Sequence, residues 1–163
     1  MSLEVQVMAW LRFEKRCPLV LFERTPRFCV GGRPDVIGVT KDRYLVEVEI
    51  KRTLSDFKAN QKKRHVLIRH LKLEAWPKQF YFMVPHTLVE KVKPLLPDYA
   101  GLLFCPDGGG YMNVEVAAKL NRASRRLSII EARRLVELQS NQLWAAVRDQ
   151  QYVEPLWESE VCI

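Results

Sequence analysis

Cysteine is scarce in this sequence, and its placement argues against two common scaffolds of small proteins. The 163 residues contain four cysteines, and none belongs to a CxxC or Cys/His motif: Cys17, Cys29, Cys105 and Cys162. Structural zinc sites and disulfide frameworks both depend on such pairing. We therefore expect reduced thiols in a cytoplasmic protein.

Long apolar runs and targeting signals are also missing. No apolar stretch approaches the length needed to cross a bilayer. The first residues, Met1 to Glu4, lack the basic start and apolar stretch of a secretory signal peptide. We expect a protein of the cytoplasm, with no membrane partner.

A nucleotide-binding loop is the third absence. Gly108, Gly109 and Gly110 form a glycine run, but the lysine and hydroxyl of the GxxxxGK[ST] motif do not follow it. The run lies between two predicted strands, so it predicts a hairpin turn.

The charged residues are unbalanced toward positive charge. Lysine and arginine total 26 against 19 aspartates and glutamates, which gives a formal net charge of +7 and a pI near 9.4. This balance favours a polyanionic partner, with nucleic acid ahead of a membrane surface.

One predicted helix concentrates this charge. It begins at Ser55 as N-cap and runs to about Leu73; between Phe57 and Lys72 it has no acid, six Lys or Arg and two His. Five basic residues share one face, at spacings of four and three: Lys58, Lys62, His65, Arg69 and Lys72. A solvated face normally mixes signs. The stripe therefore predicts contacts with DNA phosphates. Arg33, in a predicted loop over residues 24–33 that leads to Asp35, is a further candidate.

Acidic residues gather on two predicted strands that a hairpin joins. From Val46 to Lys51, apolar and charged residues alternate, which predicts a half-buried strand with Glu49 and Lys51 on one face. Asp35 opens a second alternating run, and a turn from residue 40 to 43 carries it alongside Glu49. Two carboxylates and an ammonium that converge predict a divalent-metal site.

This arrangement resembles the PD-(D/E)xK nuclease superfamily, with Pro34-Asp35 as the first half of its motif and Glu49-Ile50-Lys51 as the second. The chain is also similar to the MmcB-type DNA-repair proteins of bacteria and to their phage relatives. That similarity lies in three segments: residues 46–57, 80–85 and 95–102.

The resemblance implies a fold and an activity. The expected fold is α/β, a mixed central sheet flanked by helices with a restriction-endonuclease-like αβββαβ core. We expect this core in residues 1–120, and a helix and tail in residues 121–163 that pack on it or extend it. The implied function is a metal-dependent DNA nuclease in DNA repair or phage DNA processing, in a bacterial or phage-infected cell.

The resemblance also assigns roles to individual residues. Asp35, Glu49 and the backbone carbonyl of Ile50 are the expected ligands of Mg²⁺ or Mn²⁺, and Lys51 is expected to orient water or offset charge. Gln61 is expected to point at the scissile phosphate. Glu4, on a predicted amphipathic helix over residues 3–15, is a further candidate ligand, although an acid in the first turn also suits the helix dipole.

Other interpretations remain open at this stage. Glu49 and Lys51 could be a salt-bridged strand pair with no catalytic role. A nucleic-acid-binding protein on the same fold that no longer cuts, or an RNA nuclease, would share these features. A homodimer is compatible with the sequence. In the predicted C-terminal helix, residues 128–148, a stripe including Leu135, Val136 and Leu143 is expected to face the core.

Overall fold

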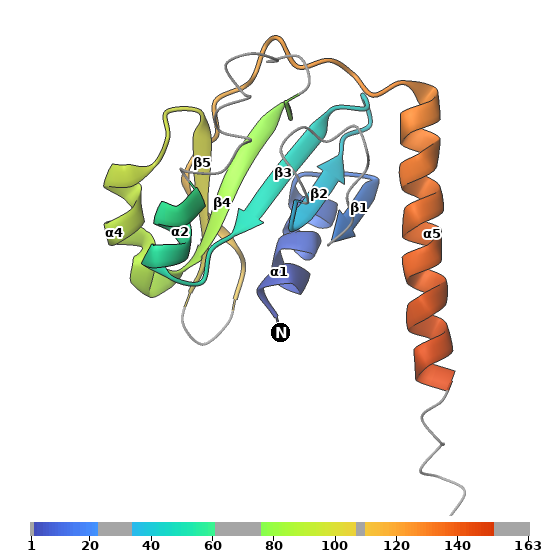
Figure 1. Cartoon of the computed structure of the whole chain (residues 1–163), viewed down its shortest axis with the longest axis horizontal. Coiled ribbons are helices and arrows are strands. Elements are labelled where there is room, and N and C mark those ends of the chain that lie inside the picture. The colour runs from blue at the N-terminus through green and yellow to red at the C-terminus, as the bar shows by residue number, and fades with distance from the viewer. Residues whose placement is uncertain (1, 23–33, 61–75, 107–109, 152–163) are drawn as a thin grey trace, which may run out of the picture.

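The protein is built around one sheet. A computed structural model describes residues 2–22, 34–60, 76–106 and 110–151. The six strands lie side by side in chain order (Figure 1): β1 Leu19–Phe22, β2 Val36–Val39, β3 Leu45–Ile50, β4 Gln79–Pro85, β5 Ala100–Cys105 and β6 Asn113–Val116. The helices are α1 Leu3–Ala9, α2 Leu54–Asn60, α4 Val89–Val92 and α5 Ile129–Gln151.

The strands run in mixed directions. β1, β2 and β3 form an antiparallel meander, β3, β4 and β5 are parallel, and β6 returns antiparallel to β5. The expectation of a mixed α/β sheet flanked by helices is confirmed. In the described ranges no helix is both long and apolar enough to cross a bilayer.

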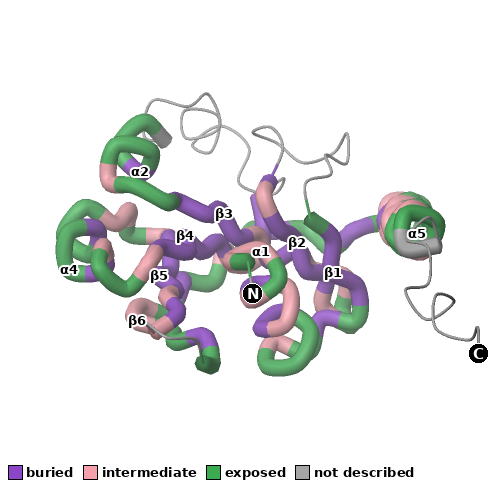
Figure 2. Tube along the Cα trace, turned by 90° about the horizontal axis from the view of Figure 1, so that it is seen from below, coloured by how far each residue is buried: buried purple, intermediate pink, exposed green. Residues whose placement is uncertain are grey.

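Helices cover both faces of the sheet, and Figure 2 shows α1 and α2 on opposite sides of it. The α1 face is packed by a cluster that includes Val7, Val48 and Tyr81. On the α2 face, Phe57 packs edge-on against Phe82, with ring centroids 4.9 Å apart. β4 lies at the centre of the sheet, and its apolar residues are buried on both faces.

The polar side of β3 lies between two apolar clusters on the α2 face. Leu45, at one end of this side, belongs to a cluster with Ile37 and Leu135. Phe82, which is paired with Glu49 across the strands, belongs to the cluster of α2 and α4. Successive residues of a strand alternate between faces. The charged residues after Leu45 are therefore held between two packed regions.

α5 closes the β1 edge of the sheet (Figure 1). Its Gln139 and Gln142 amides donate to the backbone carbonyls of Val20 and Phe22, at 3.0 and 2.7 Å. These bonds occupy acceptors on a strand edge that could otherwise pair with another chain. Leu135 is fully buried against this edge, whereas other apolar residues of the helix face solvent.

Several local expectations need correction. Thr53, not Ser55, caps α2, since its hydroxyl accepts from the Asp56 N–H at 3.1 Å. Both residue types cap helices well, and the chain leaves β3 early enough for Thr53 to take this place. On α5, Val136 and Leu143 are 54% and 64% exposed, so their predicted place in the core is wrong.

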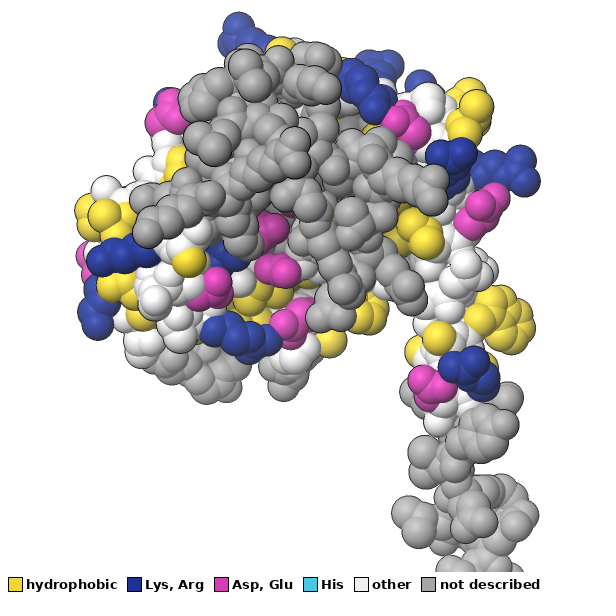
Figure 3. Space-filling model, viewed as in Figure 1, with side chains coloured by type: hydrophobic (Ala, Val, Ile, Leu, Met, Phe, Trp, Pro, Cys, Tyr) yellow, Lys and Arg dark blue, Asp and Glu magenta, His cyan; other side chains and the backbone are white. Residues whose placement is uncertain are grey.

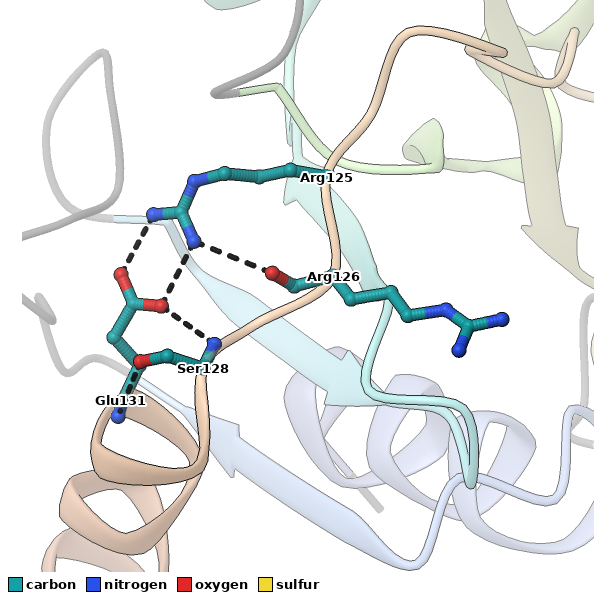
Figure 4. A network of polar contacts seen from close by, with 4 residues as sticks. All are labelled: Arg125, Arg126, Ser128 and Glu131. Carbon is teal, nitrogen blue, oxygen red and sulfur yellow. Dashed lines mark hydrogen bonds and ion pairs between the residues drawn. The ribbon is translucent and has the colours of Figure 1, made fainter.

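A capping box fixes the start of α5 (Figure 4). The Ser128 N–H donates to the Glu131 carboxylate at 2.8 Å, and the Glu131 N–H donates to the Ser128 hydroxyl at 3.2 Å. Arg125 adds a two-pronged contact to the same carboxylate, at 2.6 and 2.8 Å. Hydrogen bonds from Arg125, followed by those from Ser128, lower the pKa of Glu131 to about 2 despite partial burial.

Glu131→Gln tests this network, because glutamine preserves the capping geometry and removes the charge. The lowered pKa stabilises the fold above the ordinary value of 4.5, and this contribution is lost as pH falls through about 2. We expect the variant to be less stable by at most about 1 kcal/mol at neutral pH. The difference should close between pH 4.5 and 2 in urea unfolding.

Glu137→Gln is the matched control, since Glu137 forms an exposed i,i+4 pair with Arg133 on the same helix. A stability difference for Glu131→Gln that stays constant across this pH range would show that the pKa of Glu131 is not lowered in the folded protein.

Candidate functional site

The pairing of β2 with β3 brings the predicted acids together. Val36 lies opposite Val48 in this antiparallel pair, so Asp35, one residue earlier, comes opposite Glu49. The Ile50 N–H donates to Oδ2 of Asp35 at 2.7 Å. Asp35 therefore lies alongside Glu49, as the hairpin predicts, and is anchored to the backbone of β3.

Glu49 and Lys51 form a direct ion pair. Nζ of Lys51 lies 2.9 Å from Oε2 of Glu49. Lys51 is 3% exposed and Glu49 is 5% exposed. The alternation predicts their shared face correctly, but it predicts a half-buried strand. These two residues are instead almost fully buried.

Lys51 remains charged in this environment. Burial disfavours its ammonium, but the attraction and hydrogen bond of Glu49, with the charges of Asp56 and Asp35, outweigh burial and raise its pKa above the ordinary value. The site therefore holds a positive charge next to its carboxylates at neutral pH.

Glu47 is a third carboxyl on the same side of β3. Burial raises its pKa to about 8, and repulsion from Glu49 and Asp35 adds to the effect. It is thus largely protonated at neutral pH. The sequence leaves Glu47 open as an outer-shell helper, a spare ligand or a surface residue, and the alternation that selects Glu49 also places Glu47 on this face.

Glu4 has a different environment. Its carboxylate pairs with Arg52, one residue past Lys51, at 2.5 Å. The pKa of Glu4 is lowered, first by a hydrogen bond from its own backbone N–H and also by Ser2 and Arg52, although partial burial opposes this shift. Its described contacts join α1 to the end of β3, and its role as a metal ligand stays a prediction.

Most of the predicted nucleic-acid contacts lie outside the described residues. Lys58 is exposed on α2. Six other predicted site residues lie outside the described ranges: Arg33, Gln61, Lys62, His65, Arg69 and Lys72. Figure 3 shows the α2 face, on which acidic side chains gather beside α2, near the end of β3, with Lys and Arg side chains next to them.

The donor set suits a hard divalent cation. Among the described residues, no three His, Cys, Asp or Glu side chains group as a metal site. The predicted ligands near the end of β3 are the carboxylates of Asp35 and Glu49 and the carbonyl of Ile50. Mg²⁺ typically takes one or two carboxylates and completes its shell with water, so the residues present fit such an ion.

Comparisons with known proteins show the fold alone. No family model matches the chain, and no curated protein matches it. A solved structure, the SPO1766 protein of unknown function from Silicibacter pomeroyi, is similar with a TM-score of 0.57 and 20% sequence identity. The similarity covers 94% of this chain and 92% of that chain. It therefore extends over the α/β sheet and its surrounding helices.

We expect the buried ion pair of Glu49 and Lys51 to contribute to the free energy of unfolding. Lys51→Met leaves the Glu49 charge buried without its cation, and we expect a loss of roughly 3–5 kcal/mol in urea unfolding at neutral pH. Glu49→Gln combined with Lys51→Met removes both charges and should recover most of this loss.

Lys119→Met provides the comparison, because Lys119 forms an exposed pair with Asp98 and should cost less than about 1 kcal/mol. If Lys51→Met were equally mild, Glu49 and Lys51 would not be energetically coupled in the folded protein.

Proposed function

We propose that this protein is a metal-dependent DNA nuclease of the PD-(D/E)xK type, on a restriction-endonuclease-like core. The observation that carries the proposal is the hydrogen bond of Asp35 to the Ile50 N–H, next to the Glu49–Lys51 ion pair. Two acids and a charged lysine thus meet where β2 begins and β3 ends.

Asp35, Glu49 and the carbonyl of Ile50 would hold Mg²⁺ or Mn²⁺. When bound, such an ion lowers the pKa of a coordinated water and polarises a phosphoryl oxygen. The Ile50 N–H keeps the Asp35 carboxylate oriented through its 2.7 Å hydrogen bond. Anchoring of this kind reduces the reorganisation that ligand binding requires.

Lys51 supplies positive charge at a fixed position. Its pKa is raised above the ordinary value, so Nζ keeps its proton at neutral pH. An ammonium held in a buried site stabilises negative charge that develops on phosphate oxygens more strongly than it would in water. Its ion pair with Glu49 holds the side chain along β3 until substrate arrives.

DNA is the proposed partner because of charge. The chain carries a net charge of +7, and Lys58 is exposed on the helix that follows the site. Each lysine or arginine that neutralises a phosphate releases counterions, so binding should weaken steeply as salt concentration rises.

A second candidate is a nucleic-acid-binding protein that does not cut. The burial of Glu49 and Lys51, at 5% and 3% exposure, favours it, because a closed ion pair can stabilise a strand without meeting substrate. In that case Asp35 and Glu49 are structural, and only the basic residues that contact nucleic acid, such as Lys58, are functional.

A cleavage assay separates the two candidates. The protein is incubated with Mg²⁺ or Mn²⁺ and with plasmid, linear, branched and single-stranded DNA, with RNA in parallel. Asp35→Asn and Glu49→Gln keep side-chain shape and should lower cleavage on the order of a hundredfold or more. Thermal unfolding confirms that each variant is folded.

Asp98→Asn is the control, since Asp98 is an exposed acid paired with Lys119; it should cleave like the unaltered protein. Binding of DNA without cleavage in either metal would reject the nuclease and leave the non-cutting protein. Cleavage of RNA but not of DNA would show that the protein is an RNA nuclease.

A further inference from the structure

A cavity of about 450 Å³ lies on the α1 face of the sheet, opposite the face that holds the carboxylates of Asp35 and Glu49. Its walls come from α1, from the π-helix Trp10–Glu14 that continues α1, and from the segment before β6. Six of its lining residues matter for what it could bind: Gln6, Trp10, Phe13, Glu14, Tyr111 and Met112. Its size falls within the range of small-ligand pockets, roughly 300–1,000 Å³.

Two aromatic rings stand at its opening. Phe13 and Tyr111 are 75% and 86% exposed, whereas Trp10 in the wall is 4% exposed. Such exposure leaves most of each apolar ring in water, at a cost in hydration free energy. Rings in this position can instead stack on a planar ligand.

The polar groups of the cavity can fix such a ligand. Within the described part of the chain, Oε1 of Gln6 is buried and has no hydrogen-bond partner. A buried polar atom of this kind normally finds a partner. The Glu14 carboxylate is a second acceptor in the lining. Together they fit a ligand that brings N–H donors.

The cavity lining contains one acid, Glu14, and three basic residues flank Phe13 in the sequence. Arg12, Lys15 and Arg16 all lie within three residues of Phe13. Nζ of Lys15 lies 5.3 Å from the centroid of the Trp10 ring and donates to the Tyr81 hydroxyl at 3.1 Å. The net charge of +7 attracts a phosphate backbone, and a neutral base carried on that backbone can donate its N–H groups to the Glu14 carboxylate.

The π-helix explains how these groups come together. An α-helix that widens to a π-helix is rare, and such turns are frequent at functional sites. Here the widened turn spans Phe13 and Glu14, and it places both in the lining with Gln6 from the preceding α-helical turns.

We propose that this cavity binds an unpaired nucleobase of a nucleic-acid strand, an inference that rests on the proposed nucleic-acid partner. The base stacks on Phe13 and Tyr111, and its exocyclic amino group donates to Gln6 or Glu14. Bases with such a group, including cytosine, bind better than thymine, which has none. The site lies apart from the carboxylates and holds a single-stranded part of the substrate.

Fluorescence anisotropy with short cytosine-only and thymine-only single strands tests the proposal on the full chain. The unaltered protein should bind the cytosine strand more tightly. Phe13→Ala combined with Tyr111→Ala should weaken its binding about tenfold or more, since stacking contributes substantially for each base. Gln6→Leu should reduce the preference for cytosine. Trp144→Ala, which removes an exposed aromatic from α5, should change neither.

Two results would overturn the proposal: unchanged affinity in the double variant, or equal affinity of the unaltered protein for the two strands. Cleavage of duplex DNA, measured separately, tests the carboxylate site. Base binding without cleavage would therefore reject the nuclease and retain the cavity's assignment, and cleavage without base binding would do the reverse.

Discussion

The ion pair between Glu49 and Lys51 inside β3 is the interaction on which the rest of the site depends. A charge taken out of water is costly unless an opposite charge and hydrogen bonds compensate it. The two residues are 2.9 Å apart, and Asp35 lies beside them on the Ile50 N–H. Glu47, whose pKa burial and then the charges of Glu49 and Asp35 raise to about 8, is a third carboxyl on the same side of β3.

The fold separates the molecule into regions with different tasks. The meander of β1, β2 and β3 aligns Asp35 with Glu49, while the parallel strands β4 and β5 form the apolar centre. α5 covers the β1 edge through Gln139 and Gln142. The opposite face carries the aromatic cavity of α1. A strand of nucleic acid that reached both the carboxylates and this cavity would have to pass around an edge of the sheet.

Much of this arrangement could be predicted from the sequence, because it follows from local periodicity. Alternation identified β2 and β3, and their hairpin predicted the approach of Asp35 to Glu49. The predictions fail where another element decides the outcome. Alternation shows that Glu49 and Lys51 share a face, but not that this face is covered. Helical spacing likewise groups Leu135 with its neighbours, whereas contact with β1 selects Leu135 and leaves Val136 in solvent.

Calorimetric titration with Mn²⁺ measures whether Asp35 and Glu49 jointly hold a divalent cation, as we propose. We predict one Mn²⁺ bound per chain, with affinity reduced by at least about tenfold in Asp35→Asn, because one of two carboxylate ligands is lost. Bound Mn²⁺ should also raise the thermal unfolding temperature of the unaltered protein. Equal Mn²⁺ affinity in the two proteins, or no binding in either, would show that Asp35 and Glu49 do not hold a shared cation.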